Sequence, residues 1–250
     1  MKKNRVMMVL SLVLVLVVNF LANSLPINNL TTGEISDQFP ILFVPAGYVF
    51  SIWGLIYLAL IGFAFHIITP KGRENKNIDA IASWFIAANL FNTAWIFLWH
   101  YEQFVLTLIP IIGLLISLIA IYLKLRVGLE KRLRVEKLLV DLPFSIYLGW
   151  ATVAVVANVA QAVYSIGWRG EPFTQPVWTV IMLVVASALG VMMIFFRKEV
   201  AYPLVLVWAF VGIWMKQGNT SSAGMAALIA AILLGVLAFR QLFLHKPKKS

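Results

Sequence analysis

The sequence predicts an all-α integral membrane protein with eight transmembrane helices and both termini in the cytoplasm. The chain is 62% hydrophobic and 12% charged, with a mean hydropathy of +0.91, far from the roughly half-apolar composition of soluble domains. The apolar residues fall into runs of about 20, which cross a hydrocarbon core of about 30 Å as helices. The basic residues lie in short clusters between these runs, as expected when charge sets the orientation.

The apolar runs occupy approximately residues 6–23, 46–68, 79–100, 103–125, 138–162, 176–196, 200–215 and 222–243. The seventh is the shortest and begins with Tyr202-Pro203, so a re-entrant segment is its alternative. The first follows a basic start and precedes the small and polar Ala22-Asn23-Ser24, so it could be a cleaved signal peptide. Its length favours a retained anchor.

The distribution of Lys and Arg predicts the orientation. With the N-terminus inside, the outer segments contain only Arg169 and Lys216 of the 20 basic residues. The inner segments then contain the other 18, which are Lys2, Lys3, Arg5, Lys71, Arg73, Lys76, Lys124, Arg126, Lys131, Arg132, Arg134, Lys137, Arg197, Lys198, Arg240, Lys246, Lys248 and Lys249. The positive-inside rule therefore predicts cytoplasmic termini. We expect a multi-pass protein of the cell (plasma) membrane.

Several classes of function are disfavoured. The net charge of +10 is explained by orientation in the membrane, so we expect no nucleic-acid partner. The chain has no cysteine, and His66 and His100 lie near opposite membrane faces, so we expect no metal site. No Asp, Glu, Lys or Arg lies deep in a span, which disfavours active ion transport. No catalytic motif is present, and we expect neither enzymatic activity nor a required cofactor.

The long outer segment at residues 24–45 is a candidate lid. It lacks Lys and Arg, carries Glu34 and Asp37, and ends in the apolar stretch from Phe39 to Val44. Loops of this length are usually functional or disordered, and the apolar end argues against disorder.

Three spans each carry a stripe of aromatic, small and amide side chains at helical spacing. The stripes are Phe50, Trp53, Tyr57 and Ile61 in the second span; Trp84, Ala88, Asn92, Trp95 and Trp99 in the third; and Tyr147, Trp150, Ala154, Asn158 and Gln161 in the fifth. Most of the tryptophans and amides fall in the outer half of the membrane, where they can converge beneath the candidate lid. Apolar walls with a few convergent polar groups are typical of a ligand pocket.

Each stripe also has a structural interpretation. The interfacial aromatic belt explains Trp99, Trp168, Trp178 and Trp214 without a ligand, and we assign them to it. Amides such as Asn89 and Asn92 commonly bond across helices in membranes. Trp150 lies too deep for the belt, and its indole N–H needs a partner, so we expect this ring to face inward.

Three motifs on the second, third and fifth spans resemble the TspO/translocator-protein family (tryptophan-rich sensory proteins, TspO/MBR). Pro45 with Tyr48-Val49-Phe50, Trp53 and Tyr57 resembles the family pattern PPxWVxxPVWxxLY. Asn92-Thr93-Ala94-Trp95 with Leu98-Trp99 is similar to LNxxWxxLFF. Tyr147-Leu148-Gly149-Trp150 with Ala154 and Asn158 is similar to PYLxWxxFAxxLN. Ala46 and Ile146 replace two family prolines, and the spacing from Tyr48 to Trp53 is one residue short, which leaves the ligand's identity open.

The resemblance implies a five-helix TspO-like bundle in residues 1–162, with the outer loop 24–45 folded over a pocket for porphyrins, haem and other apolar ligands. Residues 163–250 would then be a C-terminal extension of about three transmembrane helices. Carried over by position, the ligand-binding residues would be Trp53, Tyr57, Asn92, Trp95, Trp150, Ala154 and Asn158.

The leading hypothesis is a receptor, sensor or carrier that binds a flat apolar ligand such as a tetrapyrrole. Arg169 could meet the polar edge of that ligand if the outer loops close, although a solvated loop explains this residue more simply. The alternatives are a passive permease for a small apolar or neutral solute and a membrane assembly partner. The expected partners are the lipid bilayer and the small apolar ligand, with a homodimer left open.

Overall fold

The computed structural model describes residues 3–25 and 27–244, and within these ranges the chain is helical and has no strand. The basic residues Lys2, Lys246, Lys248 and Lys249, used above to predict the orientation, lie outside the described residues. The elements are α1 (Lys3–Ser24), η1 (Ile27–Asn29), α2 (Thr32–Asp37), η2 (Gly47–Ser51), α3 (Ile52–Ile68), α4 (Pro70–Glu74), α5 (Lys76–His100), α6 (Leu108–Lys124), α7 (Arg134–Glu136), η3 (Lys137–Asp141), α8 (Leu142–Ser165), α9 (Gln175–Arg197), α10 (Ala201–Gln217) and α11 (Ser222–Leu244).

The predicted apolar runs coincide with long helices. Among the described residues, six helical segments are long and apolar enough to cross a membrane: Lys3–Ser24, Gly47–Ile68, Lys76–His100, Arg134–Ser165, Gln175–Arg197 and Ser222–Phe243. The chain is therefore an all-helical, multi-pass membrane protein. The two remaining apolar helices, α6 and α10, have 17 residues each. Their crossing of the membrane, and with it the total of eight spans, remains a prediction.

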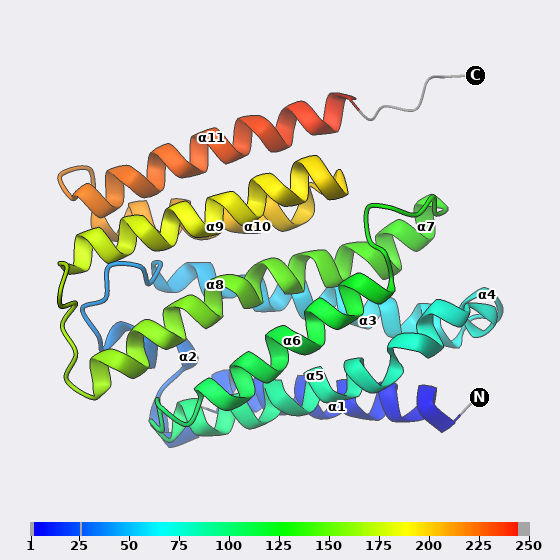
Figure 1. Ribbon diagram of the computed structural model, residues 1–250. Coiled ribbons are helices and arrows are strands. Elements are labelled where there is room, and N and C mark those ends of the chain that lie inside the picture. The colour runs from blue at the N-terminus through cyan, green and yellow to red at the C-terminus, as the bar shows by residue number, and fades with distance from the viewer. Residues whose placement is uncertain (1–2, 26, 245–250) are drawn as a thin grey trace.

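The helices run between two ends of one bundle (Figure 1). The start of α1 and the end of α11 lie at the same end, together with α4 and α7, whereas α2 and the connection between α8 and α9 lie at the opposite end. The end holding α4 and α7 is the one that the basic clusters predict to be cytoplasmic. We call it the inner end, and the end holding α2 the outer end.

The short helix α10 reaches from one end of the bundle to the other. Just before it, the Glu199 carboxylate accepts hydrogen bonds from the backbone N–H of Ala201 at 2.8 Å and from Ser145 Oγ, near the start of α8, at 2.8 Å. Near its other end, Lys216 Nζ contacts Asp37 Oδ1 of α2 at 2.5 Å. Contacts at both ends match the course expected of a spanning helix more closely than that of a re-entrant one.

Helix α8 is the central element of the bundle. Its span is 67% buried, the largest buried share among the long apolar helices. It packs against α3 and α6 on one side and against α10 on the other. Because α10 lies directly on α8, residues 1–162 and 163–250 share one packed interior in this structure. The division of the chain into two domains at that point remains a prediction.

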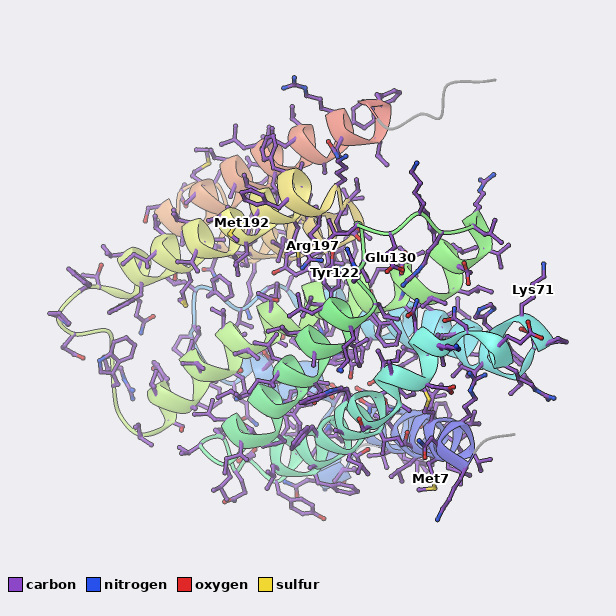
Figure 2. The ribbon with its side chains drawn as sticks, turned by 45° about the vertical axis from the view of Figure 1, so that its right-hand side comes forward. Met7, Lys71, Tyr122, Glu130, Met192 and Arg197 are labelled. Atoms are coloured by element: carbon purple, nitrogen blue, oxygen red, sulfur yellow. The ribbon has the colours of Figure 1, made fainter. Side chains whose placement is uncertain are left out.

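Polar contacts at the inner end also join the early helices to the later ones. Figure 2 shows Tyr122, Glu130 and Arg197 close together there, and the Arg197 guanidinium lies 5.6 Å from the centre of the Tyr122 ring. The Arg132 side chain, which is 4% exposed, pairs with Asp141 and Glu130 within the connection between α6 and α8. The contact of Arg197 with Tyr122 places the inner end of α9 against the end of α6.

Candidate functional site

Residues 27–46 form a folded cover over the outer end of the bundle, which we call the outer lid. Its helix α2 begins with a reciprocal cap. The Thr31 hydroxyl accepts from the Glu34 backbone N–H at 3.3 Å, and the Glu34 carboxylate accepts from the Thr31 backbone N–H at 2.7 Å. The Glu34 carboxylate also accepts from the Thr31 hydroxyl at 2.8 Å. The bond from the Thr31 backbone N–H and this second bond favour the charged carboxylate and lower the pKa of Glu34. The local sequence thus builds a short helix in the middle of the lid.

The outer lid is fastened to the ends of α5 and α8. Trp99 Nε1 donates to the Thr32 carbonyl at 3.2 Å, and Gln161 Nε2 donates to the Ser36 carbonyl at 3.2 Å. The lid residues Ile35, Phe43 and Val44 are fully buried. The lid is therefore an ordered part of the core, as its apolar end predicts.

A small cavity of about 20 Å³ lies beneath the outer lid. It is lined by residues of the lid, η2, α3, α5 and α8: Ser36, Pro45, Phe50, Trp53, Trp95, Trp99, Trp150, Val153, Ala154, Ala157, Asn158 and Gln161. We call it the aromatic cavity. Its volume is enough for about one water molecule.

The aromatic rings around the cavity form a continuous cluster across three helices. The centre of the Trp53 ring lies 6.2 Å from that of Trp95 and 6.2 Å from that of Trp150. Trp95 stacks on Trp99 at 5.4 Å, and Trp53 stacks on Tyr57 at 5.5 Å. Stacked and edge-to-face rings of this kind present flat apolar faces to whatever enters between them.

Trp150 carries an unused hydrogen-bond donor at the cavity. Its side chain is 2% exposed, and its Nε1 has no hydrogen-bond partner within the described chain. The neighbouring Phe50 ring, 5.7 Å away and edge to face, offers no acceptor atom. Leaving a buried donor unpaired costs about 1–3 kcal/mol. An acceptor atom on a bound molecule would recover part of this cost.

The two predicted asparagines are fully engaged in contacts between helices. Asn158 accepts from Trp95 Nε1 at 2.7 Å and donates to Thr107 Oγ1 at 2.6 Å. Asn92 accepts from Asn19 Nδ2 at 2.9 Å and donates to the Tyr147 hydroxyl at 2.8 Å. Asn158 therefore positions a ring of the cavity wall, and Asn92 ties α1, α5 and α8 together.

The structure brings most of the predicted site residues together. Trp53, Trp95, Trp150, Ala154 and Asn158 line the aromatic cavity. Tyr57 and Asn92 lie just behind this lining, Tyr57 stacked on Trp53 and Asn92 hydrogen-bonded to Tyr147.

The assignment of Trp99 to the interfacial belt is wrong. The residue is 2% exposed and lines the cavity, because the outer lid covers it and accepts its N–H. Trp99 lies four residues after Trp95, and this spacing indicated that both rings share one helix face. Sequence reasoning also missed Ser36, which the lid brings to the cavity.

Arg169 lies away from the aromatic cavity. Its guanidinium sits 3.7 Å from the centre of the Tyr164 ring and donates to the Tyr164 carbonyl at 2.8 Å. This position fits the solvated-loop interpretation of Arg169. Among the described residues, no group of three or more His, Asp or Glu side chains could hold a metal ion.

The fold and the site together define a multi-pass helical membrane protein whose aromatic cavity is closed by an ordered outer lid. Within that class, the chain belongs to the TSPO-like protein family, whose model matches residues 5–240. The matched range continues through α9, α10 and most of α11. No match was found among curated proteins or among solved structures.

Proposed function

We propose that this protein binds a flat apolar ligand of the porphyrin or haem type in the aromatic cavity, as a membrane receptor, sensor or carrier without catalytic activity. Membership of the TSPO-like family supports a ligand-binding membrane protein of this general kind. The observation that carries the proposal is the buried and unpartnered N–H of Trp150 at a cavity walled by tryptophans. Rings would stack on a flat ligand, and this N–H would donate to an acceptor on it.

The ligand has to enlarge the cavity in order to bind. A volume of about 20 Å³ holds one water, whereas pockets for drug-sized ligands have about 300–1,000 Å³. The outer lid forms one wall of the cavity through Ser36 and Pro45. Binding would therefore involve displacement of the lid.

Quenching of intrinsic tryptophan fluorescence by protoporphyrin IX in detergent tests the proposal. We expect saturable quenching of the wild type. The Trp150→Phe variant keeps an aromatic ring but loses the N–H, and we expect its affinity to fall about fivefold, because a hydrogen bond contributes about 1 kcal/mol.

The matched control is Trp178→Phe. This residue donates to the Gly170 carbonyl at 2.7 Å in the connection between α8 and α9, away from the aromatic cavity. Its dissociation constant should equal that of the wild type. Unsaturable quenching, or equal affinity in the wild type and the Trp150→Phe variant, would contradict binding at this site.

A passive permease for a small apolar or neutral solute is the second candidate, because a cavity of about 20 Å³ is closer in size to a small solute than to a tetrapyrrole. Uptake of a radiolabelled neutral solute by sealed vesicles containing the pure protein measures this activity. Uptake above that of empty vesicles, together with unsaturable porphyrin quenching, would favour the permease.

A further inference from the structure

The outer lid is held by α10 as well as by α5 and α8. At the outer end of α10, Lys216 Nζ contacts Asp37 Oδ1 of the lid at 2.5 Å. The next residue, Gln217, donates through Nε2 to the Leu42 carbonyl at 3.1 Å. Lys216 is one of the two basic residues predicted on the outer side, and this ion pair gives it a specific partner.

Closer to the membrane interior, α10 also touches the end of the lid and η2. The Ala46 backbone N–H donates to the Gly212 carbonyl at 3.1 Å, and Trp208 Nε1 donates to the Val49 carbonyl at 3.1 Å. A Cβ atom on Gly212 would lie 2.2 Å from Cγ2 of Val49 and 3.1 Å from Cβ of Pro45. Any residue larger than glycine at this position would push Val49 of η2 away from α10 and would crowd the lid at Pro45.

The segments that α10 holds are the same ones that close the aromatic cavity. Ser36, Pro45 and Phe50 line the cavity, and each adjoins a residue held by α10. None of the lining residues belongs to α10. The helix therefore acts on the cavity through the lid, η2 and α8.

We propose that α10 controls access to the aromatic cavity by holding the outer lid closed, and that ligand exchange requires release of its contacts with Asp37, Leu42 and Ala46. This gives α10 a regulatory role, and it rests on the proposed ligand-binding function. The Asp37 and Lys216 side chains are 48% and 26% exposed. Ion pairs this accessible stabilise weakly, so the closed lid can open reversibly.

The first test measures lid opening without a ligand. Because the chain contains no cysteine, Ala154→Cys introduces a single thiol at the cavity lining. Its reaction rate with a charged methanethiosulfonate reagent reports access from the outer solution. Adding Lys216→Met to this variant should raise the reaction rate about two- to fivefold. This is the fold-change that corresponds to the loss of an exposed ion pair. Gly212→Val should raise it further, because the new side chain displaces the lid.

Two controls separate gating from general destabilisation. The first control is Tyr101→Cys, because the Tyr101 side chain is already 59% exposed. The reaction rate of this thiol should be the same with and without Lys216→Met. The exchanged pair Asp37→Lys with Lys216→Asp restores opposite charges, and it should return the Ala154→Cys rate toward that of the parent. A rate that stays high in the exchanged pair, or one that Lys216→Met never raises, would overturn the proposal.

The second test measures association of protoporphyrin IX with the same variants by stopped-flow fluorescence. Faster association in Lys216→Met and Gly212→Val than in the wild type would support gating of ligand entry. Saturable binding with unchanged association rates, together with unchanged thiol reactivity, would overturn gating and leave the proposed function intact. Absence of binding in every variant would overturn the proposed function, while the thiol rates would still decide whether α10 controls the lid.

Discussion

At the scale of single residues, the buried polar groups of the described chain differ in whether they have a hydrogen-bond partner. Arg5 is 1% exposed and pairs with Asp79 at 2.8 Å, while its guanidinium also donates to the carbonyls of Gly72 at 2.7 Å and Asn75 at 3.2 Å. One arginine thereby ties α1 to the connection between α3 and α5. The Trp150 N–H has no such partner among the described residues, and of the buried groups in that position it is the one that lines the aromatic cavity.

We expect Arg5→Gln to lower the free energy of unfolding by about 1–3 kcal/mol, because the variant loses the charge-assisted hydrogen bonds of the buried guanidinium to Asp79, Gly72 and Asn75. Thermal unfolding in detergent measures the change. Lys3→Gln, an exposed change on the same helix, should leave the melting temperature unaltered. Equal stability of the Arg5→Gln variant and the wild type would mean that the hydrogen bonds of this guanidinium do not anchor α1.

At the scale of elements, close packing of α8 against α10 joins the early helices to the C-terminal ones. A Cβ atom on Gly149 would lie 3.1 Å from the Tyr202 carbonyl oxygen and 3.1 Å from Cβ of Val205. Small residues at such crossings allow two membrane helices to approach closely. The glycine between Leu148 and Trp150 therefore also sets the distance from the cavity wall to α10.

Gly149→Leu should destabilise the protein by about 1–3 kcal/mol, the usual cost of overpacking a tight interface. Gly54→Leu is the matched control, because the Cβ position at Gly54 has nothing within 4 Å. Chemical unfolding of the two variants in the same detergent compares them. If both lose the same stability, the contact between α8 and α10 is not the cause.

At the scale of the whole molecule, the two ends of the bundle differ in charge. The exposed basic residues Lys71 and Arg134 lie on α4 and α7 at the inner end, and Tyr101 and Glu171 lie in connections at the outer end. The positive-inside rule places the first pair in the cytoplasm. Orientation and the number of spans are therefore tested together by asking which side of the membrane each connection faces.

Single cysteines in this cysteine-free chain provide that test. With an impermeant maleimide, we expect Tyr101→Cys and Glu171→Cys to react in intact cells. Lys71→Cys and Arg134→Cys should react only after permeabilisation. For α10, Asn219→Cys should react like Tyr101→Cys, and Lys198→Cys like Lys71→Cys. Reaction of residues 198 and 219 from the same side would show that α10 does not cross the membrane.

Much of the architecture follows from local sequence. The eight apolar runs coincide, to within a few residues at most ends, with α1, the joined η2 and α3, α5, α6, α8, α9, α10 and α11. They do so because the length of an apolar run and the polar breaks beside it are local properties of the sequence. The stripe spacing also brought Trp53, Trp95 and Trp150 to one cavity, because residues three and four apart share a helix face.

The sequence by itself determined the membrane class, the helical segments and the faces that carry the aromatic rings. Only the tertiary structure decided that Trp99 is covered, that Arg5 is buried and that Lys216 holds Asp37. These outcomes join residues 67 or more positions apart, through the packing of the lid, of α1 and of α10. Local periodicity carries no information about such contacts, because a helix face shows that it is buried but not which segment buries it.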